Sequence, residues 1–123
     1  MAYFEELSIW QQAKELTKEI YEMMQNSRDW GLRDQIQRAS VSIMNNIAEG
    51  SESGSAPSYI RFLNIAKGSS AEVRSMLYLC GEFGYCSMEQ QQRLFDLCRM
   101  ISAGINSLIR FLQENQQKNS FNL

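Results

Sequence analysis

The feature that most constrains this chain is the spacing of its apolar residues, which recur at steps of three and four in four separate segments. That spacing places them on one face of an α-helix. The stretch from 87 to 113 shows it most cleanly, with a stripe of Leu94, Leu97, Ile101, Ile105 and Leu108. The only proline is Pro57, so little in the chain interrupts helical segments. The pattern therefore predicts an all-α protein.

The segments with this spacing predict four helices and a polar tail, at about 8–25, 32–49, 56–83, 87–113 and 114–123. The connections between the helices are short, which favours antiparallel neighbours. We therefore expect an up-down-up-down antiparallel four-helix bundle. No repeat or change of composition divides the chain, and its length fits a single domain at 1–123.

Serine marks the predicted start of three helices. Ser8 with Gln11, and Ser87 with Gln90, follow the capping-box pattern, in which a hydroxyl and an amide each satisfy a free backbone N–H. Ser55 is placed to cap the third helix in the same region as the proline of its first turn. We expect side-chain caps at all three positions.

Glycines mark the ends and one interior position of the predicted helices. Gly50 is expected to end the second helix in a left-handed conformation, and Gly84 to end the third. Gly68 lies inside the third helix, where glycine costs about 1 kcal/mol relative to alanine. A close approach of another backbone, or a slight bend, is expected there.

Composition excludes several classes of function. A net charge of −2 argues against simple nonspecific binding of polyanions. The chain has no histidine, so it lacks the commonest general base and metal ligand. Its three cysteines form no C-x-x-C pair, which is typical of reduced thiols in a cytoplasmic protein. No apolar run is long enough for a membrane span, and acids stand where a signal peptide would be basic.

No motif for catalysis or for a cofactor is present. The run Gly50–Gly54 has Glu52 where a nucleophile elbow needs serine, and no lysine follows Gly54 as a P-loop requires. The loop could form an anion-binding nest, but Glu52 would repel an anion, so a plain interhelical turn is favoured. We expect a protein that is not an enzyme and holds no cofactor or metal.

Two strings carry a family resemblance: S-I-x-x-N-I-A-E-G from Ser42 to Gly50 and R-F-L-x-I-A-x-G-S from Arg61 to Ser69. With LSIWQQAKEL near the start, they resemble the four-helix-bundle family encoded within intervening sequences of bacterial 23S rRNA genes. That family is sometimes labelled ribosomal-protein-like, and the same fold serves as the accessory protein of diversity-generating retroelements. The resemblance implies a homopentameric ring, an association with RNA genes or reverse transcription, and no enzymatic activity. After A-E-G-S the family usually continues with a Gly-Arg pair and nearby lysines, whereas residues 52–57 of this chain contain no basic residue.

Polar and small residues gather around the central loop. They form a predicted structural junction of Arg38, Asn46, Glu49, Gly50, Arg61, Gly68, Ser69 and Glu72. We favour a hydrogen-bond and ion-pair network that fixes the second helix against the third or against a neighbouring subunit. A ligand or RNA contact is the alternative.

Basic residues are mostly matched by nearby acids, as in the i,i+4 pairs Asp34/Arg38 and Glu89/Arg93. The candidate nucleic-acid contacts that remain are Arg61, Lys67, Arg74 and Arg110. A fivefold ring would multiply so small a patch.

Tyr78 and Phe95 lie beside the apolar stripes, which is consistent with an oligomer contact or equally with partial burial in one subunit. The preferred function is a cytoplasmic, non-enzymatic, homo-oligomeric scaffold or accessory protein of unknown cellular process. The alternative is an RNA- or DNA-binding accessory protein linked to rRNA intervening sequences or to a reverse transcriptase.

Overall fold

The computed structural model describes the backbone of residues 3–121 and the side chains of residues 3–116. Its described part is helical, with a short 3-10 turn followed by four α-helices: η1 (Phe4–Glu6), α1 (Ser8–Met24), α2 (Trp30–Ser51), α3 (Ala56–Glu82) and α4 (Met88–Phe121).

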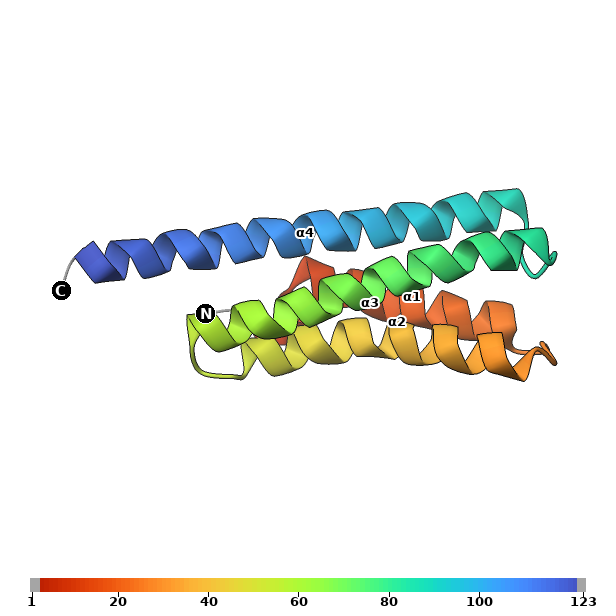
Figure 1. Cartoon of the computed structure of the whole chain (residues 1–123), viewed down its shortest axis with the longest axis horizontal. Coiled ribbons are helices and arrows are strands. Elements are labelled where there is room, and N and C mark those ends of the chain that lie inside the picture. Colours follow the sequence, from red (N-terminus) through yellow and green to blue (C-terminus); the bar gives the residue numbers. More distant parts are fainter. Residues whose placement is uncertain (1–2, 122–123) are drawn as a thin grey trace.

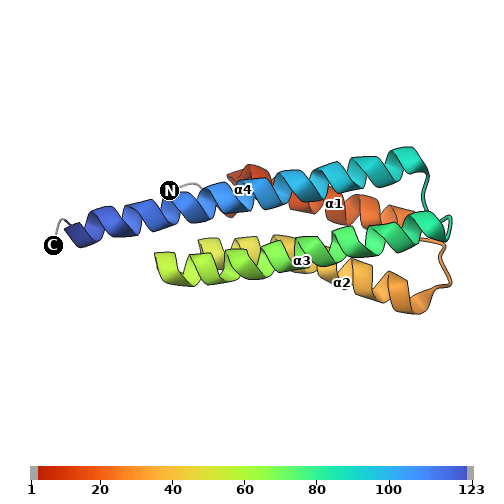
Figure 2. The ribbon, with the colours of Figure 1, turned by 45° about the horizontal axis from the view of Figure 1, so that its top comes forward.

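The four helices form a closed bundle. Each helix packs against the next along the chain, and α4 also packs against α1. Successive helices run in opposite directions (Figure 1), and the turned view in Figure 2 shows the same side-by-side arrangement. The predicted all-α, up-down-up-down fold is confirmed.

The helices differ in length, and α4 is the longest. Its 34 residues span about 51 Å, whereas the 17 residues of α1 span about 25 Å. The C-terminal part of α4 therefore projects past the α2–α3 turn (Figure 1). The prediction that this helix ends near 113 is wrong, because the helix continues through the polar segment; residues 122–123 of the predicted tail lie outside the described residues.

The core is built from the residues that the three-and-four spacing selects. All four helices contribute fully buried aliphatic side chains: Leu16, Ile20, Met24, Ile36, Ile43, Ile47, Leu63, Val73, Leu77, Leu94, Ile101 and Ile105. Removing this apolar surface from water is the main force that holds the helices together.

Two of the three predicted serine caps are formed. The Ser55 hydroxyl accepts a hydrogen bond from the backbone N–H three residues on, at 3.3 Å, and Ser87 does the same at 3.1 Å. The cap at Ser8 is wrong, because this residue already lies within α1. The Gln11 amide instead donates to the Glu5 carbonyl at 3.0 Å, which ties η1 to α1.

The turn after α2 differs from the prediction. Gly50 lies inside the helix, which continues to Ser51, and the left-handed residue of the turn is Gly54, at φ +89°. Gly84 follows the end of α3, as predicted, and is left-handed at φ +74°. The α2–α3 turn therefore begins later along the chain than the sequence suggests.

The two loops at the other end of the bundle are joined to each other. Tyr85, in the α3–α4 loop, donates its hydroxyl proton to Asp29 Oδ2 in the α1–α2 loop at 3.0 Å. Asp29 also caps α2 by accepting from the Leu32 N–H at 3.3 Å. This cap explains why α2 begins at Trp30 rather than at Leu32.

Arg93 ties α4 to α1. Its Nε and a terminal nitrogen each lie 2.8 Å from a carboxylate oxygen of Glu19. The predicted pairing of Arg93 with Glu89 is wrong, and so is that of Asp34 with Arg38, since neither occurs among the ion pairs of the described residues. The bidentate contact between helices is the more favourable geometry for a guanidinium.

Candidate functional site

The uncharged part of the predicted junction lies where the middle of α2 packs against the middle of α3. The hydroxyls of Ser42 and Ser69 are 2.9 Å apart. The Asn46 amide donates to the Ser42 carbonyl at 2.8 Å and to its hydroxyl at 3.0 Å. Asn46 and Ser69 are thus brought together through Ser42, which the prediction omitted. The hydrogen bonds keep these polar groups satisfied at the contact between the helices.

The charged part of the predicted junction is arranged differently. Its four residues are exposed and take part in no ion pair among the described residues: Arg38, Glu49, Arg61 and Glu72. Arg38 and Glu72 line opposite sides of an open groove between α2 and α3. The Arg61 guanidinium lies 4.8 Å from the centre of the Phe62 ring. Among the described residues, these four therefore form no ion-pair network.

Gly50 has a packing role at this junction. A Cβ atom at Gly50 would lie 2.9 Å from Cδ1 of Tyr59 and 3.0 Å from Cβ of Phe62. The missing side chain lets the Tyr59 ring lie directly against the last turn of α2. Tyr59 is buried, so burial raises the pKa of its hydroxyl, and a hydrogen bond with Ser51 partly opposes this rise.

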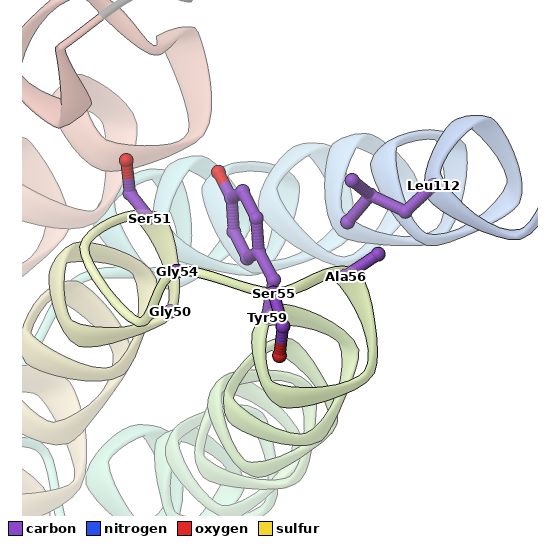
Figure 3. Close-up of a pocket in the computed structure, with 7 residues that line it drawn as sticks. All are labelled: Gly50, Ser51, Gly54, Ser55, Ala56, Tyr59 and Leu112. Carbon is purple, nitrogen blue, oxygen red and sulfur yellow. The ribbon is translucent and has the colours of Figure 1, made fainter. Parts of the chain in front are cut away.

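A cavity of about 180 Å³ opens beside Tyr59, between the α2–α3 turn and α4 (Figure 3). It is lined by Gly50, Ser51, Gly54, Ser55, Ala56, Tyr59 and Leu112. Most of this lining is apolar, and the Ser55 hydroxyl is already hydrogen-bonded to α3. The cavity is therefore poorly suited to an anion, which favours the plain-turn interpretation of the loop.

Gly68 lies on the outside of α3, and no described residue of the chain makes the close approach that was one of the two expected reasons for this glycine. A Cβ atom built at Gly68 would meet nothing within 4 Å. We call the surface around it the outer face of α3, which consists of Ile65, Gly68, Ala71, Ser75 and Leu79, all exposed. Ile65 and Leu79 keep 44% and 41% of their surface exposed, so the face is apolar at two positions.

The candidate nucleic-acid contacts fall on two sides of the molecule. Lys67 and Arg74 lie on the side of α3 that meets α4, and Arg110 lies on α4 itself. Arg61 is separate from them, because its guanidinium is held over Phe62, the residue beside Gly50 of α2. Sequence reasoning missed Arg99, which joins this α3–α4 group; finding it requires the register of the two helices.

Tyr78 and Phe95 were expected either to form an oligomer contact or to be partly buried in one subunit, and the two residues differ in this respect. Phe95 is buried, with 7% of its surface exposed, whereas Tyr78 keeps 56% exposed. Their ring centres are 4.9 Å apart. Phe95 therefore belongs to the packing of one subunit, and Tyr78 presents an aromatic face to the outside.

The described residues include possible metal ligands and three thiols. They contain no group of three or more metal-ligating side chains, and the described helices include none with the length and apolar character needed to cross a bilayer. Cys80, Cys86 and Cys98 are free thiols. Burial raises the pKa of both Cys80 and Cys98 to about 11, which keeps these thiols protonated and weakly nucleophilic at neutral pH.

Comparison with known proteins gives a family and a fold. The family model described as 23S rRNA-intervening sequence protein matches residues 5–107. A solved structure of a protein with unknown function, from the S23 ribosomal protein family of Bacteroides thetaiotaomicron, is 25% identical with a TM-score of 0.76. The match covers 82% of this chain and 97% of that chain. No curated protein matches the chain.

Proposed function

Because this chain belongs to the 23S rRNA-intervening sequence protein family, we propose that it is a non-enzymatic scaffold or accessory protein that assembles with copies of itself. A ring of five subunits is proposed on the family resemblance. The absence of histidine from the sequence and the weakly nucleophilic buried thiols favour a binding role over catalysis. Three free thiols are in keeping with a reducing compartment such as the cytoplasm.

Gly68 is the observation that carries this proposal. Glycine inside a helix costs about 1 kcal/mol relative to alanine. At Gly50 a steric reason within the chain accounts for that cost, but at Gly68 a Cβ would meet nothing within 4 Å. A second subunit whose backbone approaches the outer face of α3 supplies the missing reason.

The surroundings of Gly68 support the same surface. Ile65 and Leu79 expose apolar area on either side of it along α3. Arg38 and Glu72, on the neighbouring α2–α3 groove, carry opposite charges without an ion-pair partner among the described residues. A small-residue centre with apolar and charged flanks is consistent with a contact between subunits.

Light scattering coupled to gel filtration at micromolar concentration tests the assembly. We expect a multiple of 14.2 kDa, and five times that mass for the ring. The Gly68→Leu variant should shift toward the single-chain mass, because the new side chain occupies open space in one subunit but blocks a close neighbour.

Gly31→Leu is the matched control, since a Cβ at Gly31 also meets nothing within 4 Å, but Gly31 is the second residue of α2 and lies outside the helix interior, where glycine carries its full cost. It should assemble as the parent does, and circular dichroism should show both variants folded. A molar mass of 14.2 kDa for the parent protein, which is that of a single chain, would contradict the proposal. Equal assembly of the two leucine variants would remove its main support.

A further inference from the structure

The charges of this protein are divided unevenly along its length. Residues 1–55 contain nine acidic and five basic residues, whereas residues 56–123 contain five acidic and seven basic residues. The net charge of −2 is therefore the sum of a negative first part of the chain, with α1 and α2, and a positive second part, with α3 and α4. Exposed charges more than about 10 Å apart are largely screened at 0.1 M salt, so distant acids do little to cancel a positive surface.

Four basic residues of the positive second part of the chain lie along the contact between α3 and α4. We call them the α3–α4 stripe: Lys67, Arg74, Arg99 and Arg110. The Lys67 ammonium donates to Asn106 Oδ1 across the two helices at 3.2 Å. Arg110 follows Asn106 by one turn of α4, so it lies on the same side.

The buried Cys98 thiol of α4 lies near the middle of the stripe. Burial raises the pKa of this thiol, and the nearby guanidinium groups of Arg74, from α3, and Arg99, from α4, both act to lower it. Two guanidinium groups from different helices therefore lie near one point of the α3–α4 contact. Along α4, the step from Arg99 to Arg110 is about 16 Å.

An aromatic ring lies at one end of the stripe. Tyr78 is 56% exposed, and its ring packs against the buried ring of Phe95 at 4.9 Å. The Arg99 guanidinium lies 5.8 Å from the same Phe95 ring. Tyr78 and Arg99 thus both contact Phe95, and Tyr78 keeps more than half of its surface exposed.

Two acidic residues lie beside the stripe on α4: Asp96, next to Arg99, and Glu114, one turn beyond Arg110. Asp96 is 3.7 Å from Arg99, with both side chains more than half exposed. Such an exposed pair contributes little, about 0–1 kcal/mol, so Arg99 is readily exchanged onto a stronger anion. Glu72 lines the α2–α3 groove and is not part of this surface.

We propose that the α3–α4 stripe binds a single strand of nucleic acid. The four cations contact successive phosphates, and an unpaired base stacks on Tyr78. The aromatic ring favours this ligand over an acidic peptide, because a base offers a flat face for stacking and a carboxylate does not. It also favours a single strand over a duplex, whose bases are already stacked on one another.

Fluorescence anisotropy with the whole chain tests the proposal. The probes are fluorescein-labelled oligouridylate and oligothymidylate of about 20 nucleotides, and a duplex of the same length. We expect both single strands to bind at about 50 mM salt and to weaken with a log–log slope near −2.8, as four phosphate contacts require. Either single strand bound more tightly than the duplex supports the proposal, and the two arms show which sugar is preferred.

Separate variants test the cations and the aromatic ring of the site. Arg74→Ala with Arg99→Ala should lower affinity at least about tenfold and reduce the slope by about 1.4. Tyr78→Ala should lower affinity about fivefold or more, whereas Tyr78→Phe keeps the ring and should bind as the parent does. Arg110→Glu, at an exposed position, provides a charge reversal should the double variant misfold.

Lys14→Ala with Arg28→Ala is the matched control, because it removes the same charge from exposed positions at α1 and the following loop. The proposal is overturned if this control loses as much affinity as the stripe variant. Binding without salt dependence, or competition by polyglutamate as effective as by unlabelled oligouridylate, would overturn it too. Light scattering of every variant separates lost binding from lost assembly.

Discussion

At the scale of single residues, Gly50 decides how closely α2 and α3 meet. A Cβ atom there would lie 2.9 Å from the buried Tyr59 ring and 3.0 Å from Cβ of Phe62, which is attached directly to the α3 backbone. We therefore predict that Gly50→Ala lowers the free energy of unfolding by about 1–3 kcal/mol, as overpacked substitutions do. Urea denaturation followed by circular dichroism measures this loss.

Gly31→Ala is the control for that experiment. Both glycines lie in α2, but nothing lies within 4 Å of a Cβ at Gly31. It should leave the protein equally or slightly more stable, because alanine is the better helix former by about 1 kcal/mol. If Gly50→Ala also proved neutral, the steric account of the α2–α3 contact would be wrong.

Two buried thiols predict a loss of stability in alkali. Burial raises the pKa of Cys80 and Cys98 from 9.0 to about 11. Below pH 9 both the folded and the unfolded chain hold these protons, so the contribution to stability is full. Between pH 9 and about 11 only the unfolded chain releases them, so stability falls as the pH rises.

The unfolding free energy, measured in urea across this range, should therefore decline more steeply in the parent than in a Cys80→Ala, Cys98→Ala double variant. The comparison of slopes cancels the titration of lysines and tyrosines that both proteins share. Parallel pH profiles for the two proteins would contradict the prediction.

The sequence identifies glycines as special positions, but it does not show what each of them is for. Gly50 was expected to supply a left-handed turn and instead makes room for Tyr59, while Gly54 supplies the turn. Gly68 was expected to allow the close approach of another backbone or a slight bend, and no described residue of the chain approaches it. The need for space at a glycine depends on which residue faces it from another helix, and periodicity within one helix does not contain that information.

At the scale of elements, apolar periodicity predicts four helices because it reports the side that each helix buries. It fails at α4, whose polar segment after 113 has no apolar stripe and is nevertheless helical to Phe121. Extending an existing helix by one residue needs no new nucleus, so good helix formers such as Gln, Glu and Lys continue it. Apolar periodicity also places the start of α2 two residues late, because the Asp29 side chain that caps the helix is polar and does not belong to an apolar stripe.

The Ser42–Ser69 hydrogen bond links α2 to α3 and yields a prediction for that contact. Ser42→Ala or Ser69→Ala alone leaves one polar group at the contact with a lost partner, and each should cost about 1–2 kcal/mol of unfolding free energy. The double variant should cost less than the sum, because both partners are then removed together. A double-mutant cycle from urea denaturation measures the coupling, and strictly additive losses would show that the 2.9 Å contact contributes nothing.

At the scale of the whole molecule, short connections predict the order of the helices, but the sequence does not predict their register. The Arg93–Glu19 contact and the approach of Arg99 to Arg74 both join residues far apart in sequence. Local pairing rules assigned Arg93 to Glu89 instead. The candidate site therefore could be predicted in part, as with Lys67 and Arg74, and its completion by Arg99 required the packed bundle.

An even number of antiparallel helices returns the chain to the end at which it started. The two ends of the described chain lie toward the same end of the bundle, beside the α2–α3 turn, and the α1–α2 and α3–α4 loops occupy the other end (Figure 1). A fluorescent protein or affinity tag fused before η1 would therefore lie toward the end of the bundle that holds the cavity next to Tyr59. A tag inserted in the loop at Gly84 would leave that end, and the middle of the bundle with Gly68, free.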